Sequence, residues 1–169
     1  MTREVWIVMG SDSDAEIMKV AQDTLRDFGV PSQMFVSSAH RSPLRTAELA
    51  RSAKDKGVGC FIVGAGAAAH LAGVIAAETP LPVIGVPIDS SALKGLDALL
   101  STVQMPGGVP VACMAIGKAG AQNAALFAIQ MLSLSDDSLS HAYVTYKEKL
   151  AKGVEEKHRK LQERLNPKE

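Results

Sequence analysis

Five short apolar runs alternate with longer amphipathic segments along this chain, and this alternation constrains its fold more than any other feature. Each run has the length of a β-strand, and its apolar residues are consecutive rather than alternating with polar ones. Strands with this pattern are covered by helices on both faces. The sequence therefore predicts a three-layer, doubly wound α/β domain with a parallel five-stranded sheet and right-handed crossovers.

The predicted elements follow one another as five strand–helix units. The strands are expected at Val5–Met9, Ser32–Ser37, Gly59–Val63, Pro82–Val86 and Val109–Ile116. The helices are expected at Asp14–Phe28, at Pro43–Lys56, in a segment ending near Glu78, in a segment through Leu96–Leu100, and at Ala119–Leu132. For five such units the simplest doubly wound strand order is 2-1-3-4-5.

The C-terminal segment, 136–169, differs in composition because 15 of its 34 residues are charged. An apolar stripe at helical spacing crosses this polar background. The stripe consists of Leu139, Tyr143, Tyr146, Leu150, Val154, Leu161 and Leu165. We therefore divide the chain into an α/β catalytic core, 1–135, and a C-terminal helical extension, 136–169. The extension either folds back on its own domain or docks on a neighbouring subunit, and docking in an oligomer is favoured.

Charge and composition exclude several classes of partner. The chain carries 18 basic and 18 acidic side chains, whereas a nucleic-acid surface needs a clustered basic excess. The apolar run before Gly10 is too short for a signal peptide or a membrane span. Cys60 and Cys113 lie in apolar runs and are expected to be buried, reduced thiols of a cytoplasmic protein. No His, Cys, Asp and Glu residues have metal-ligand spacing, so no metal site is predicted.

Ligands of an open parallel sheet bind beyond the carboxyl ends of the strands, close to the point where the strand order reverses. The segment after the first strand, 10–14, reads Gly-Ser-Asp-Ser-Asp and leads directly into a helix. Its hydroxyls and the free helix N–H groups suit a phosphate, and Asp14 suits the hydroxyls of a sugar. The same residue types are also favoured as simple helix caps, so this segment alone leaves both interpretations open.

The loops after the second and third strands place further candidate binding and catalytic residues at the same edge of the sheet. His40 can exchange a proton near neutral pH, and the adjacent Arg41 can form paired hydrogen bonds with phosphate oxygens. The third loop, 64–71, consists mostly of glycine and alanine, so its backbone can approach a flat ligand closely. A surface histidine and a tightly packed helix start are the alternatives, but three such loops at one edge favour a binding site.

The loop sequences, in this order and spacing, resemble the PurE family. The matching segments are GSDSD at 10–14, SAHR at 38–41, GAGAAAHLAG at 64–73, VQMPGGVPV at 103–111 and AIGKAGAQNAALFA at 115–128. Together they cover nearly the whole core. The resemblance implies a flavodoxin-like domain, a homo-octamer and no cofactor or metal. It also implies an isomerase of de novo purine biosynthesis that converts N5-carboxyaminoimidazole ribonucleotide to 4-carboxy-5-aminoimidazole ribonucleotide by decarboxylation and recarboxylation.

The resemblance also assigns roles to individual residues. His40 is expected to be the catalytic general acid and base. The expected substrate-binding residues are Ser11, Ser13, Asp14, Ser38, Ala39, Arg41, Gly66, Ala67, Ala68, His70 and Leu71. Within this set Ser13, Ser38 and Arg41 are expected to hold the phosphate, with Ser11 nearby. Asp14 is expected to bind the ribose. The residues from Gly66 onward border the imidazole and the migrating carboxylate.

Two residues depart from the family pattern GAGGAAHLPG. Ala67 stands in place of the usual glycine and adds a methyl group beside the ligand, and Ala72 stands in place of the usual proline at a helix start. Neither change removes a reacting group. Two other functions remain open: an aminoimidazole ribonucleotide carboxylase that uses dissolved CO2 directly, and a non-enzymatic nucleotide-binding module on the same fold. The second leaves His40 and the small-residue loop without a purpose.

Overall fold

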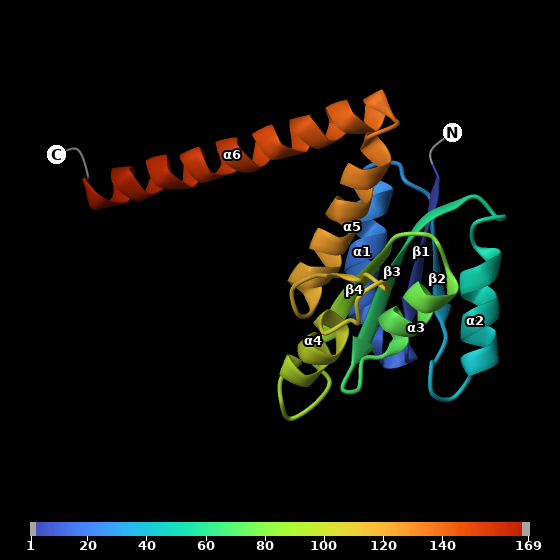
Figure 1. Ribbon diagram of the computed structural model, residues 1–169. Coiled ribbons are helices and arrows are strands. Elements are labelled where there is room, and N and C mark those ends of the chain that lie inside the picture. The colour runs from blue at the N-terminus through green and yellow to red at the C-terminus, as the bar shows by residue number, and fades with distance from the viewer. Residues whose placement is uncertain (1–2, 167–169) are drawn as a thin grey trace.

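The computed structural model describes residues 3–166 and contains a five-stranded sheet at its centre (Figure 1). The strands are β1 (Glu4–Met9), β2 (Ser32–Val36), β3 (Val58–Gly66), β4 (Val83–Ile88) and β5 (Ala112–Cys113). They pair in parallel in the order β2-β1-β3-β4-β5. This confirms the predicted flavodoxin-like, doubly wound sheet.

Helices cover both faces of the sheet, as its continuous apolar strands require. The helices are α1 (Ala15–Asp27), α2 (Pro43–Ser52), α3 (Leu71–Glu78), α4 (Leu96–Val103), α5 (Lys118–Ser133) and α6 (Asp137–Leu165). A short 3-10 turn, η1 (Asp12–Asp14), precedes α1. Helices α1 and α5 pack side by side on one face, and α2, α3 and α4 lie on the other (Figure 1).

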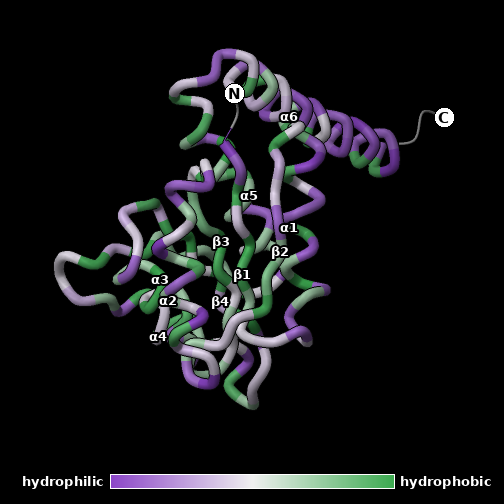
Figure 2. The backbone as a smooth tube through the Cα atoms, turned by 90° about the vertical axis from the view of Figure 1, so that its right-hand side faces the viewer, coloured by the Kyte–Doolittle hydropathy of each residue, from purple (hydrophilic) through white to green (hydrophobic). Residues whose placement is uncertain are grey.

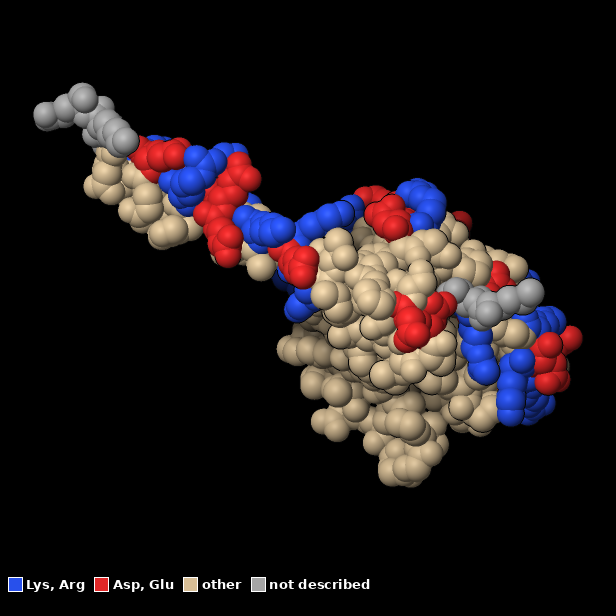
Figure 3. All heavy atoms as spheres, turned by 90° about the horizontal axis from the view of Figure 1, so that it is seen from above, with Lys and Arg blue, Asp and Glu red and all other residues tan. Residues whose placement is uncertain are grey.

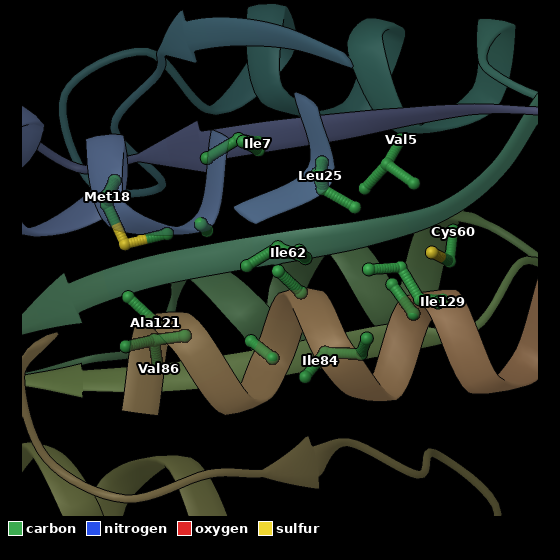
Figure 4. Close-up of a cluster of buried hydrophobic side chains, with 14 of the residues drawn as sticks. Val5, Ile7, Met18, Leu25, Cys60, Ile62, Ile84, Val86, Ala121 and Ile129 are labelled. Carbon is green, nitrogen blue, oxygen red and sulfur yellow. The ribbon is translucent and has the colours of Figure 1, made fainter. Parts of the chain in front are cut away.

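The sheet separates two hydrophobic cores because successive side chains of a strand point to opposite faces. In β1, Val5 and Ile7 face α1 and α5, whereas Trp6 and Val8 face the other helices. Figure 4 shows the first core, where Ile7, Ile62 and Ile129 meet between the sheet and the helices. The hydropathy-coloured tube shows the same division, with apolar strands inside and a largely polar α6 outside (Figure 2).

The largest differences from the predicted element boundaries are at α2, β3 and β5. Helix α2 ends at Ser52 rather than Lys56, in a turn that ends at Gly57 with a φ of +79°. Strand β3 continues to Gly66, so residues 64–66, which we expected in a loop, pair with β4. Strand β5 contains two residues instead of the expected eight. Pro110 cannot donate a backbone hydrogen bond, and β5 is an edge strand paired only with β4.

Helix α6 is anchored at its beginning and then leaves the core. The anchor is Leu139, which is buried, together with Tyr143 and Tyr146, whose rings lie 6.4 and 5.5 Å from that of Phe28. Beyond this point the helix projects from the domain with charged side chains along it (Figures 1 and 3). It does not fold back on its own domain, and Val154 is 66% exposed.

The structure shows how far the two cysteines are buried and whether any helix could cross a membrane. Cys60 is buried in β3, and burial raises the pKa of its thiol to about 12. Cys113 is half-buried, so it is less enclosed than we predicted, because it ends the short edge strand β5. Both thiols are free. Across residues 3–166, no helix combines the length and apolarity needed to cross a membrane.

Candidate active site

A pocket of about 360 Å³ opens at the carboxyl ends of the central strands. It forms where the order β2-β1-β3 reverses the direction of chain progression, which is the expected place for a ligand in this fold. Its walls are Gly10, Ser11, Ser13, Asp14, Ser38, Ala39, His40, Arg41, Ala65, Gly66, Ala68, Leu71 and Ser90. These residues come from the end of β3, the first residue of α3 and the segments that follow β1 to β4, so the sheet brings together side chains that are distant in sequence.

The loop after β1 supplies hydroxyl groups and one buried carboxylate. The Ser11 hydroxyl caps the 3-10 turn by accepting a hydrogen bond from the Ser13 amide at 3.4 Å. Asp14 makes no capping hydrogen bond to α1, although it occupies the N-cap position, and it is only 6% exposed. Burial raises the pKa of Asp14, and hydrogen bonds from Ser11 and Ser13 partly oppose that rise. Its carboxylate is therefore free of a capping role and can serve a ligand.

The loop after β2 is folded around Ser38. The Ser38 hydroxyl accepts a hydrogen bond from the Arg41 amide at 3.2 Å, and the Ser38 amide donates to the Ser42 hydroxyl at 3.1 Å. The Arg41 guanidinium reaches across to the first loop, where Nη2 donates to the Gly10 carbonyl at 3.3 Å. This contact places one positive charge between two hydroxyl-bearing loops. Such a grouping suits a phosphate dianion.

His40 in the pocket wall forms a pair with His70, which lies beside the pocket. His40 Nε2 lies 2.8 Å from His70 Nδ1, and the rings meet edge to face with centroids 5.0 Å apart. Two imidazoles at this distance share one hydrogen, so the tautomer of one ring determines the role of the other. The loop after β3 ends at His70, which is the N-cap residue of α3 and makes no side-chain capping bond. The pair can therefore deliver and recover a proton at the pocket.

Gly66 and Ser90 are neighbours in the pocket wall. A Cβ atom added at Gly66 would lie 1.8 Å from Ser90 Oγ, so only glycine fits at position 66. Ser90 was not among the residues that the sequence singled out. Its position directly beyond β4 was the signal that would have found it, because all strand ends meet at this edge.

Ala67 adopts the left-handed backbone conformation, with a φ of +51°. An L-residue with a side chain is disfavoured there, and glycine is not. We expected its methyl group to border the ligand, but Ala67 does not line the pocket. Replacing the usual glycine with Ala67 therefore strains the loop backbone and does not narrow the pocket. The second departure, Ala72, is buried in the first turn of α3, which still begins at Leu71.

Comparison with known proteins gives one consistent result. The profile of AIR carboxylase matches residues 4–153 of this chain. The chain belongs to the AIR carboxylase family. This confirms the resemblance to PurE proteins that the loop sequences indicated.

Several relatives are similar over nearly their whole length. The chain is 50% identical over 159 residues to the N5-carboxyaminoimidazole ribonucleotide mutase of Pyrococcus horikoshii, a match that covers 94% of this chain and 89% of the relative. It is 48% identical to the enzyme of the same name from Mycobacterium leprae, covering 96% and 95%. The crystal structure of Treponema denticola PurE matches with a TM-score of 0.84 at 26% identity, covering 94% and 98%.

The structure of this AIR carboxylase family member gathers most of the residues that the sequence singled out. All of them line the pocket except Ala67 and His70, and His70 contacts His40 from beside it. Their individual roles stay predictions. Within residues 3–166, no three His, Cys, Asp or Glu side chains are grouped so that they could hold a metal ion.

Proposed function

We propose that this protein is an N5-carboxyaminoimidazole ribonucleotide mutase of purine biosynthesis. One observation carries the proposal: the wall of one pocket combines hydroxyls and the Arg41 guanidinium, which suit a phosphate, with His40, which pairs with His70 beside the pocket. Relatives about half identical in sequence carry that enzyme name. A further relative, 51% identical over 152 residues that make up 15% of its length, is a bifunctional purine synthesis protein of Dictyostelium discoideum.

The lining of the pocket supports one proposed orientation of the substrate. Its phosphate lies among Ser13, Ser38 and Arg41, where hydroxyls and a guanidinium converge. The ribose hydroxyls donate to the Asp14 carboxylate. The imidazole then lies over Gly66 and Ala68, where the absence of large side chains leaves room for a flat ring and its carboxylate. Ala39 and Leu71 complete the wall, and Ser11 supplies a further hydroxyl.

The reaction needs one proton to be delivered and one to be removed. His40 donates a proton to the exocyclic nitrogen of the carbamate, the N–C bond breaks, and CO2 and the aminoimidazole form. The adjacent ring carbon then attacks CO2, and the new carbon–carbon bond leaves that carbon with a surplus proton. His40 accepts this proton and returns to its starting state, so one acid–base group is sufficient and no cofactor is consumed. Holding CO2 beside the ring makes its recapture intramolecular.

Isotope retention distinguishes this mutase from an enzyme that draws CO2 from solution. Substrate labelled in its carboxylate is supplied in buffer that contains an excess of unlabelled bicarbonate. We expect most of the label to appear in the ring carboxylate of the product, because the released CO2 is recaptured before it escapes. The measurement is mass spectrometry of the product.

Two other outcomes would contradict the mutase. Complete loss of label, with a rate that follows dissolved CO2, would indicate a direct carboxylase within the same pathway. Binding of the nucleotide without any change in its ultraviolet absorbance would indicate a non-enzymatic binding module.

The proposal extends to the assembly and location of the protein. We propose that the protein forms a homo-oligomer, and the PurE resemblance implies an octamer. In this assembly the C-terminal extension, 136–169, docks on other copies, and the α/β core, 1–135, carries out the reaction. Its support is the exposed apolar face of α4, formed by Leu96, Leu100 and Val103, together with the stripe of α6. A cytoplasmic location is consistent with two free thiols.

Charges placed in the stripe of α6 should reduce the oligomer state. Leu150 and Val154 are 49% and 66% exposed, so Leu150→Lys with Val154→Lys alters a subunit contact without disturbing the fold of one copy. We expect light scattering to show a smaller assembly with an unchanged circular dichroism spectrum. Glu155→Gln, on the same helix, is the control. An assembly of unchanged size in the double variant would contradict docking through α6.

A further inference from the structure

We propose that Ser101 of α4 is a positioning residue that holds the loop 67–69 in the conformation that places His70 against His40. This inference rests on the proposed mutase function, and it assigns a role to a residue that does not line the substrate pocket. Ser101 is 30 residues or more from the loop in sequence, and α4 brings the two together.

The Ser101 hydroxyl contacts the loop at both ends. Ser101 Oγ accepts a hydrogen bond from the Ala69 amide at 3.1 Å. It also lies 3.4 Å from the Ala67 carbonyl and 3.2 Å from the Ala98 carbonyl, to either of which its one hydrogen can be donated. Within residues 3–166, Ser101 is the one side chain that forms a hydrogen bond with Ala67 or Ala69. One hydroxyl therefore connects α4 to the loop.

The loop requires such a restraint because its backbone is strained. Ala67 has a φ of +51°, in the left-handed region that an alanine rarely adopts. A strained residue of this kind persists only when its surroundings fix it. The Ala69 and His70 amides donate to the Ala67 and Ala68 carbonyls at 2.9 and 2.8 Å, which form tight turns within the loop. These bonds lie within the loop itself, so Ser101 provides the hydrogen bonds that join the loop to α4.

The position of His70 follows directly from this loop. His70 comes immediately after Ala69, and its carbonyl accepts the Val74 amide at 3.0 Å in the first turn of α3. His70 and Ser101 also line one cavity of about 500 Å³ beside the active-site pocket. A shift of the loop would therefore move the His70 ring and lengthen its 2.8 Å contact with His40. Ser101 acts on His40 through His70.

This arrangement predicts a larger effect on turnover than on binding. The phosphate cluster is formed by the loops after β1 and β2, which Ser101 does not contact, and within the loop 67–69 Ala68 alone lines the pocket. Ser101→Ala should lower kcat by about tenfold, since misplaced acid–base groups slow proton transfer strongly, and should change KM by a smaller factor. Ser101→Thr keeps the hydroxyl and should restore most of the rate.

A double-mutant cycle with Ala67→Gly tests the mechanism itself. Glycine adopts the left-handed conformation without strain, so the loop no longer depends on Ser101 to hold it there. We expect Ser101→Ala to cost about tenfold in the wild-type chain and less than about threefold in the Ala67→Gly chain. Equal losses in both backgrounds would overturn the proposal.

Hydrogen exchange gives a readout that does not depend on activity. Deuterium uptake in a peptide covering residues 67–70 should rise in Ser101→Ala, because the Ala69 amide loses one of its two acceptors and keeps only the Ala67 carbonyl within the strained loop. Ser133→Ala is the matched control: Ser133 also bonds to a carbonyl three residues earlier, at 2.7 Å, but lies on α5. It should change neither uptake nor kcat. Unchanged uptake in Ser101→Ala refutes the restraint, whereas absence of turnover in the wild-type chain refutes only the mutase function.

Discussion

Replacing His40 with asparagine is expected to lower turnover by about 10²–10⁴-fold while folding and nucleotide binding are preserved. Asparagine approximates the size of the imidazole and can form hydrogen bonds, but it cannot accept and return a proton. His40 lies at the pocket wall and is exposed, so its loss leaves no cavity in the core. Turnover is measured by ultraviolet absorbance and binding by calorimetry with the nucleotide.

The neighbouring histidine provides the comparison for this variant. His70→Asn removes the partner at 2.8 Å but leaves the group that we expect to transfer the proton. It should therefore reduce kcat less than His40→Asn does. Near-normal turnover in His40→Asn, with a large loss in His70→Asn, would transfer the acid–base role to His70.

Arg41→Ala should weaken binding of the phosphorylated substrate roughly ten- to a hundredfold, which corresponds to about 1.5–3 kcal/mol for a charge-assisted contact. The nucleoside without phosphate should bind with little change. The reason is geometric: the Arg41 guanidinium lies between Ser38 and the Gly10 carbonyl, where the pocket offers its hydroxyls. Calorimetric titration with both ligands gives the two dissociation constants.

An arginine outside the pocket provides the control for Arg41. Arg45 is exposed on the first turns of α2 and is not part of the pocket wall, so Arg45→Ala should affect neither ligand. Equal losses of nucleotide and nucleoside affinity in Arg41→Ala would show that Arg41 is not the phosphate contact.

The parallel sheet was predictable from the sequence because five strand–helix units require right-handed crossovers. The order 2-1-3-4-5 was only the simplest arrangement of those units, and the structure confirms it. The end of β3 was not, because Gly64 and Gly66 have weak strand preference and are held there by pairing with β4. Strand β5 is short because Pro110 precedes it and because β4 is its one neighbour in the sheet. Beyond Cys113, the Met114 and Gly117 amides donate to Gly85 and Pro87 as isolated contacts, which no local pattern reveals.

The candidate site was predicted in its residues but not in its contacts. His40 and Arg41 were found because their chemistry follows a strand end directly. Ser90 was missed because a serine after a strand is unremarkable until the structure places it against Gly66. The positive φ of Ala67 was also unexpected, since alanine gives no sign of a left-handed backbone. Both depend on tertiary packing and not on local sequence.

The close contact at Gly66 limits how such a pocket can diversify. A side chain at Gly66 would collide with Ser90, and one at Gly64 would lie 2.4 Å from the sulfur of Met18. At Gly10, by contrast, an added Cβ meets nothing within 4 Å. Of the two glycines that line the pocket, Gly10 therefore has room for a side chain and Gly66 does not. An engineer who reshapes the pocket should begin at Gly10 and leave Gly66 and the ends of β3 and β4 unchanged.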